Sequence, residues 1–129
     1  MLQYLSIALG GALGTLGRFW LSGFVAERAG TTFPLGTLLV NISGCLVIGF
    51  FSTLTAPEGR FMVSPTLREF VMLGICGGYT TFSSFSLQTL TLARNGEWLA
   101  AGANTVLSVA LCFAAVWLGH VLALTINRS

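Results

Sequence analysis

The side chains best suited to bind a small ion lie together in one apolar stretch, between Gly74 and Ser86. Its middle reads Gly77-Gly78-Tyr79-Thr80-Thr81-Phe82-Ser83-Ser84-Phe85, which combines tandem glycine with paired hydroxyl side chains. Such a sequence is poor helix-forming material. We therefore predict a helix break around residues 77–80. Backbone carbonyls freed by a break suit a cation, whereas exposed N–H groups and hydroxyls suit an anion.

Two aromatic residues, Phe82 and Phe85, follow the predicted break at a spacing of three, which places them on one helix face. The edge of an aromatic ring carries positive potential. Two ring edges turned inward would hold a small anion without the full charge that would trap it. The alternative is that these rings only fill core space, as most phenylalanine pairs do.

Polar residues recur at helical spacing in two other apolar stretches. Thr37, Asn41 and Cys45 share one face at i, i+4 and i+8, and the second stripe consists of Asn104, Ser108 and Cys112. An unpaired amide in an apolar interior is costly, so Asn41 should face another helix or a water-filled path. A lone Asn could simply bond between helices, but two stripes in one small protein favour a hydrated lining.

The first apolar stretch contains a charge, Arg18, and three glycines that share a face, Gly10, Gly14 and Gly17. We interpret the glycines as a helix-packing surface. A charge inside a membrane span costs roughly 2.5–3.5 kcal/mol on insertion scales and needs a partner or a route to water. Arg18 therefore either pairs within the protein or extends to the membrane interface.

The composition indicates which elements position these residues. Of the 129 residues, 54% are hydrophobic and 8% are charged, against about 25% charged in an ordinary soluble domain. A membrane-spanning helix needs roughly 20 apolar residues. We predict an all-α membrane protein, a single domain of four transmembrane helices at about residues 2–25, 33–55, 67–93 and 98–126, the third broken near its middle.

The arginines give no instruction on orientation. Lysine is absent, and Arg60, Arg68 and Arg128 fall on the side of the termini, against Arg18, Arg28 and Arg94 on the opposite side. An excess of basic residues normally marks the cytoplasmic side. From this balance we predict insertion in both orientations, with opposed copies pairing as an antiparallel homodimer about a two-fold axis in the membrane plane.

Several other classes of function fit the sequence less well. The three cysteines lie in apolar stretches and read as small buried hydrophobes, and the even spread of a net charge of +2 indicates no nucleic-acid surface. An enzyme is not expected, because His120 is the only histidine and no buried acid is available. A small dual-topology multidrug exporter would need a membrane-embedded carboxylate, and a non-transporting assembly subunit would leave Asn41 unexplained.

Over essentially its whole length the chain resembles the Fluc (CrcB) family of fluoride channels. The matching signatures are Gly17-Arg18, Gly36-Thr37 with Val40-Asn41 and Gly44, and above all the string from Gly77 to Phe85. The resemblance implies a passive fluoride channel of the cell inner membrane that exports the toxic ion, built as a dual-topology homodimer in lipid.

The resemblance also implies roles for particular residues. A structural Na⁺ ion would lie centrally at the dimer interface on the backbone carbonyls of Gly77 and Thr80. The fluoride pathway would take Phe82 and Phe85 as aromatic sites and Asn41 as a donor, with further polar contributions from Thr81, Ser83, Ser84, Ser108 and Cys112. Cys112 departs from the hydroxyl expected at its position on the last helix.

Overall fold

The computed structural model describes residues 1–129 as an all-helical chain without strands. Two long helices come first, α1 (Leu2–Ala29) and α2 (Leu35–Leu54). A segmented helical unit follows, and α6 (Trp98–Arg128) ends the chain. The segments of the third unit are α3 (Pro65–Glu69), the π-helix η1 (Phe70–Cys76), α4 (Gly77–Tyr79) and α5 (Phe82–Arg94).

The helix ends have local causes. Gly30 ends α1 with a positive φ of 79°, and Gly96 makes the turn between α5 and α6 with a φ of 83°. The third unit begins at Pro65, two residues before the predicted start, because the Ser64 hydroxyl accepts a hydrogen bond from the Leu67 N–H at 3.2 Å. The first helix extends to Ala29, four residues beyond the predicted end. The π-helix was not anticipated.

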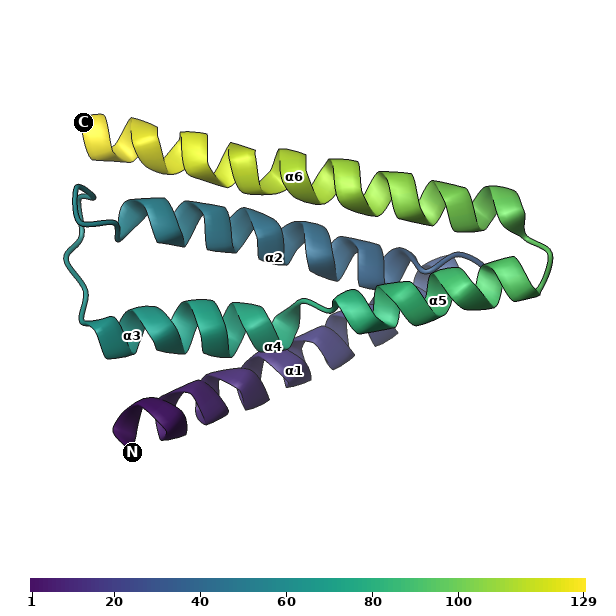
Figure 1. Cartoon of the computed structure of the whole chain (residues 1–129), viewed down its shortest axis with the longest axis horizontal. Helices are drawn as coiled ribbons and strands as arrows, with labels where there is room; N and C mark the ends of the chain where they lie inside the picture. Colours follow the sequence, from purple (N-terminus) through teal and green to yellow (C-terminus); the bar gives the residue numbers. More distant parts are fainter.

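The chain runs back and forth, so that both termini and the loop between α2 and α3 lie at the same end of the molecule (Figure 1). Helices α2 and α6 form the most extensive helix pair. Glycine permits their close approach: a Cβ on Gly49 would lie 2.2 Å from the Val116 carbonyl oxygen, and one on Gly119 would lie 2.2 Å from that of Leu46. Backbone therefore approaches backbone along this helix pair.

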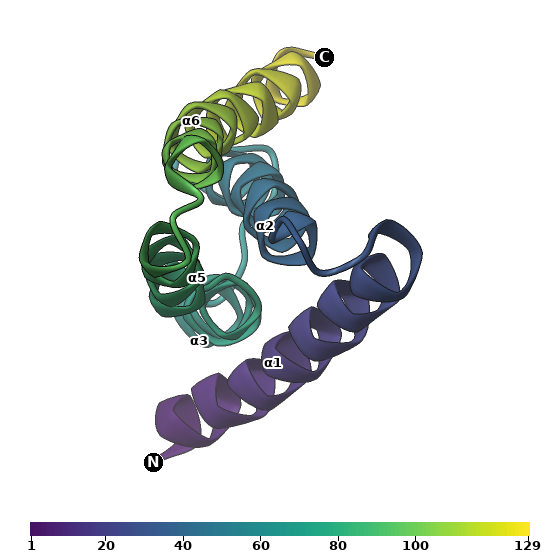
Figure 2. The same cartoon turned by 90° about the vertical axis from the view of Figure 1, so that its right-hand side faces the viewer.

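Helix α1 crosses the outer side of the third unit at an angle to the other helices (Figure 2). Its contact surface is the predicted glycine face. A Cβ on Gly10 would lie 2.6 Å from the Phe70 carbonyl oxygen, and one on Gly14 would lie 2.2 Å from that of Ile75. Backbone thus meets backbone where α1 crosses η1 and α4, which fixes the position of the chain just before Thr80.

Three helical units are long and apolar enough to cross a membrane: Leu35–Leu54, Pro65–Arg94 and Trp98–Arg128. Helix α1, with 28 residues, is long enough to cross a membrane, but its glycines and Arg18 lower its mean hydropathy. Only 19 of 129 residues are buried, and large apolar side chains such as Phe113 and Trp117 are exposed. A surface of this kind belongs in lipid or against another protein, and the chain is a multi-pass membrane protein.

Candidate functional site

The third helical unit is interrupted between Tyr79 and Phe82 (Figure 1). Thr80 and Thr81 are extended, with φ, ψ of −80°, 156° and −152°, 112°. Gly77, which we predicted to lie in the break, is helical, with φ −65° and ψ −37°. Gly78 serves the approach of α1, since a Cβ there would lie 2.5 Å from the Gly11 carbonyl oxygen, whereas a Cβ on Gly77 would meet only the Met72 carbonyl oxygen, at 3.8 Å. The chain changes direction at the two threonines.

Thr81 starts the helix that follows. Its hydroxyl oxygen accepts a hydrogen bond from the Ser84 N–H at 3.1 Å and donates to the Ser84 hydroxyl at 3.0 Å. The Ser83 hydroxyl lies 3.3 Å from the same oxygen. The three hydroxyls therefore form one cap at the N-terminus of α5, which satisfies donors that a helix leaves free at its first turn.

Asn41 of α2 holds the extended segment in place. Its Oδ1 accepts a hydrogen bond from the Thr81 N–H at 2.7 Å, and its Nδ2 donates to the Thr81 carbonyl at 3.0 Å. The carboxamide thus replaces the helical partners that Thr81 lost at the break. One hydrogen of Nδ2 remains available, because an amide nitrogen carries two.

Arg18 has a partner inside the protein. Its Nε–H donates to the Gly78 carbonyl at 3.2 Å, and the Thr15 hydroxyl donates to the same oxygen at 3.4 Å. This carbonyl lies in the last turn of α4, where the helix dipole favours a positive charge. Of the two alternatives predicted for Arg18, the structure shows the pairing within the protein.

Other carbonyls at the break have no such partner. The Thr81 N–H, which would bond to the Gly77 carbonyl in a continuous helix, bonds to Asn41 instead. The Ser84 N–H, which would reach the Thr80 carbonyl, bonds to the Thr81 hydroxyl. The carbonyls of Gly77 and Thr80 accept no hydrogen bond. Oxygen atoms left free in this way fit a hard cation such as Na⁺, and no cluster of His, Cys, Asp or Glu offers an alternative metal site.

A cavity of about 600 Å³ brings most of the predicted site residues together. None of its lining side chains is charged. The predicted residues that line it are Asn41, Gly77, Thr80, Thr81, Phe82, Phe85, Ser108 and Cys112. Ser83, Ser84 and Arg18 do not line it, because the two serines belong to the α5 cap and Arg18 lies on the α1 side.

The two phenylalanines differ in their surroundings. Their ring centroids lie 5.3 Å apart with an interplanar angle of 56°. Phe85 is buried, with 8% of its surface exposed, whereas Phe82 is 77% exposed. Phe85 therefore belongs to the core of one chain, and Phe82 extends from it.

The stripe on α6 is tied to α5 by hydrogen bonds. Asn104 is buried, and its Nδ2 donates to the Thr89 hydroxyl at 2.8 Å. Its Oδ1 accepts a long bond, 3.5 Å, from the Ser108 hydroxyl. Thr89, the partner of Asn104, and Gln88 were not predicted from the sequence. Each lies four residues after a predicted site residue on α5, Thr89 after Phe85 and Gln88 after Ser84.

Comparison with known proteins identifies similar chains. Residues 5–120 match the family described as CrcB-like protein, Camphor Resistance (CrcB). A protein of Opitutus terrae named fluoride-specific ion channel FluC is 63% identical over 127 residues, 98% of this chain and 96% of that one. Proteins of the same name from Rhodospirillum rubrum and Methylocella silvestris are 60% and 59% identical to this chain. Each match covers 98% of this chain, and it covers 98% of the first protein and 97% of the second.

Proposed function

Because the chain belongs to the CrcB-like family, we propose that it is a fluoride channel whose conduction site is built around the extended residues Thr80 and Thr81. One observation carries this function: proteins named fluoride-specific ion channel match 98% of the chain at up to 63% identity. The match spans every element that lines the 600 Å³ cavity.

The cavity offers the chemistry that fluoride requires. Fluoride is small and tightly hydrated, so a path must replace its water with hydrogen-bond donors. Three residues of the cavity can supply such groups: Asn41 through the free hydrogen of its Nδ2, Ser108 through a hydroxyl that makes only the 3.5 Å bond to Asn104, and Phe85 if its ring edge meets the ion. All of them are neutral, so none would trap the ion by full charge. Conduction needs binding that is favourable enough to admit an ion and weak enough to release it.

The physiological role follows from the chemistry of the ion. Fluoride crosses membranes as the neutral acid HF and is trapped in the cell as the anion at neutral pH. A negative-inside potential drives that anion outward, so a passive channel in the cell inner membrane is sufficient. Cargo export by proton exchange would need a carboxylate in the cavity, and none is there.

The working unit in this proposal is an antiparallel homodimer with four spans per chain. Its support is the near balance of arginines between the two ends, with Arg60, Arg68 and Arg128 against Arg28 and Arg94 once Arg18 pairs with Gly78, and the exposure of Phe82 beside the cavity of a single chain. A second, inverted copy would cover this face and bring its own Phe82 to the path. Helix α1, supported as a span by its length, would complete each subunit.

A Na⁺ ion at the dimer axis is the cofactor we assign to this assembly. The unbonded carbonyls of Gly77 and Thr80 would hold it, and both residues line the cavity. The ion would supply a fixed positive charge that joins the two subunits. Asn41 contributes by holding Thr81, and with it the Thr80 carbonyl, in the extended conformation.

The test is fluoride efflux from liposomes that contain the purified protein, measured with a fluoride electrode after a potassium ionophore sets the membrane potential. We expect rapid fluoride release, and no chloride release from liposomes loaded with chloride. Release equal to that of protein-free liposomes would contradict the channel function. Equal release of both anions would contradict the selectivity.

A further inference from the structure

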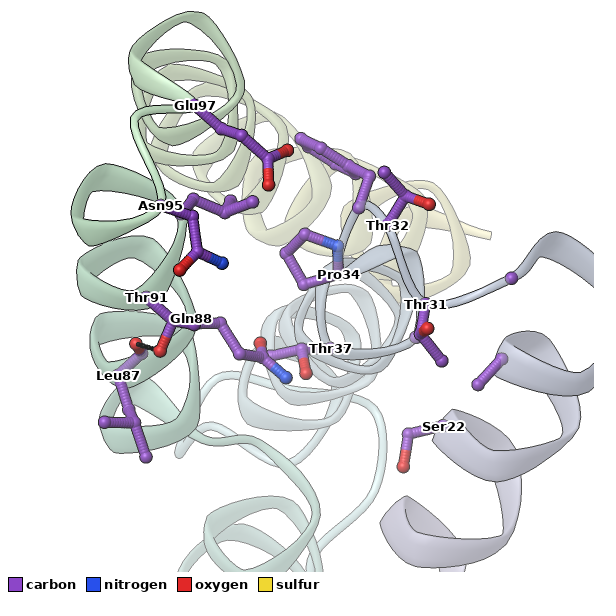
Figure 3. A pocket seen from close by; sticks show the side chains of 15 residues that line it. Ser22, Thr31, Thr32, Pro34, Thr37, Leu87, Gln88, Thr91, Asn95 and Glu97 are labelled. Atoms are coloured by element: carbon purple, nitrogen blue, oxygen red, sulfur yellow. Dashed lines mark hydrogen bonds between the residues drawn. The ribbon is translucent and has the colours of Figure 1, made fainter.

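A second pocket, of about 410 Å³, opens where the link between α1 and α2 meets the turn between α5 and α6 (Figure 3). Its walls include the hydroxyls of Thr37 and Thr91, the amides of Gln88 and Asn95, and the carboxylate of Glu97. Glu97 is the only charged residue among those that line it.

This pocket lies one helical turn from the cavity around Thr81. On α2, Thr37 lines the pocket and Asn41, four residues later, lines the cavity. On α5, Gln88 lines the pocket and Phe85, three residues earlier, lines the cavity. Residues three or four apart on a helix lie on the same face, about one pitch of 5.4 Å apart. The pocket therefore continues the cavity toward this end of the molecule.

The inner wall of the pocket is suited to water. The Oε1 atom of Gln88 is fully buried and has no hydrogen-bond partner within the chain. That oxygen does not itself face the open space, but the hydroxyls, amides and carboxylate of the pocket offer water several hydrogen-bond partners. We therefore regard the pocket as hydrated.

Glu97 forms no side-chain hydrogen bond with the helix that it precedes. It is the N-cap residue of α6, yet its side chain makes no capping hydrogen bond. Figure 3 shows its carboxylate directed into the pocket, on the side of Asn95 and Pro34. A carboxylate at this position places a negative charge in the pocket that lies one turn from the cavity.

We infer that the pocket is the mouth of the ion path and that Glu97 sets the conductance electrostatically, by lowering the local concentration of fluoride. This inference rests on the proposed channel function. A single charge at a hydrated mouth acts through the local potential, which salt screens: the Debye length is about 30 Å at 0.01 M and about 3 Å at 1 M ionic strength. The repulsion should be large in dilute salt and absent in concentrated salt.

The test compares initial fluoride efflux from liposomes at ionic strengths of about 0.01 M and about 1 M, adjusted with an impermeant salt on both sides. In dilute salt, Glu97→Gln should conduct about two- to fourfold faster than the unmodified protein. Asn95→Asp, an isosteric change that adds a second charge to the pocket, should conduct more slowly by a similar factor. In concentrated salt all three should conduct alike. Glu58→Gln, in the loop between α2 and α3 and outside the lining of both the pocket and the cavity, is the matched control.

Equal rates for Glu97→Gln, Asn95→Asp and the unmodified protein in dilute salt would overturn the inference while leaving the channel function intact. So would an effect of Glu58→Gln as large as that of Glu97→Gln. If Glu97→Gln does not fold, Asn95→Asp alone decides, since a rate unchanged in dilute salt contradicts a mouth at this pocket. Absence of efflux from the unmodified protein would contradict the channel function itself.

Discussion

The carboxamide of Asn41 forms two hydrogen bonds with the backbone of Thr81, one at 2.7 Å to its N–H and one at 3.0 Å to its carbonyl. Asn41 comes from α2 and Thr81 from the break, 40 positions later in the chain. The amide pairs with Thr81 much as a neighbouring β-strand would. This contact fixes where the helix stops, and it leaves the Gly77 carbonyl without its helical donor.

Asn41→Asp should weaken both the fold and the channel. An aspartate keeps an acceptor for the Thr81 N–H but turns a second oxygen toward the Thr81 carbonyl, so about 1–3 kcal/mol of stability should be lost. Asn41→Ala loses both hydrogen bonds but adds neither a charge nor a repulsion with the Thr81 carbonyl. Thermal unfolding in detergent should show a similar loss for both variants, and fluoride efflux should be lower in the aspartate variant. Normal efflux with Asn41→Asp would remove this residue from the ion path.

The outline of the fold could be predicted from the sequence, because helix length and apolar content are local properties. The position of the break could not. Glycine has a low helix propensity, which pointed to Gly77 and Gly78, but Gly77 stays helical, and Gly78 leaves the space that Gly11 of α1 needs. The extended residues are the threonines that Asn41 holds from another helix. That contact depends on how α2 packs, which no local pattern encodes.

The same limit applies to Arg18 and to the α6 stripe. The sequence showed that Arg18 needs a partner, but its acceptor is a backbone carbonyl, Gly78, 60 positions away. A carbonyl has no signature in a sequence. Asn104 and Ser108 were recognised by their spacing, whereas the contact of Asn104 with Thr89 depends on how α5 faces α6. Likewise, the π-helix η1 carries no recognisable pattern.

Substitutions of Phe82 and Phe85 should distinguish an effect on stability from an effect on fluoride conduction. Phe85→Ile removes a ring from a buried position and should destabilise the single chain by about 1–3 kcal/mol. Phe82→Ile changes a ring that is exposed in the single chain and should lower thermal stability in detergent less than Phe85→Ile does. If both rings contact the ion, both variants should slow fluoride efflux. Normal efflux in both variants would overturn the aromatic role.

Arg18→Gln should destabilise the packing of α1 against α4. The Gly78 carbonyl would keep only the long bond from Thr15, and a hydrogen bond from a charged donor contributes about 1.5–3 kcal/mol. Arg18→Lys preserves the charge near the α4 terminus and should retain part of the stability. The measurement is the midpoint of thermal unfolding in detergent. A glutamine variant as stable as the unmodified protein would mean that the contact contributes little.

Gly14→Ala and Gly23→Ala should have opposite effects although both lie in α1. A Cβ on Gly14 would lie 2.2 Å from the Ile75 carbonyl oxygen, so the helices must separate, at a cost of about 1–3 kcal/mol or more. A Cβ on Gly23 meets nothing within 4 Å, and alanine should stabilise the helix there by up to about 1 kcal/mol. The midpoint of thermal unfolding should fall in Gly14→Ala and rise in Gly23→Ala. Equal midpoints for the two variants would contradict the backbone contact.

Insertion in both orientations predicts that a C-terminal label is reachable from either side of the membrane. A variant with Ser129→Cys, and with Cys45, Cys76 and Cys112 replaced by alanine, presents one thiol at the end of α6. A membrane-impermeant maleimide added outside sealed vesicles should label about half of the chains, and opening the vesicles should expose the rest. Adding two arginines to the loop that contains Glu58 should bias insertion, since basic residues favour the cytoplasmic side. Labelling from one side only, in the variant without added arginines, would exclude an antiparallel dimer, because that assembly needs equal numbers of the two orientations.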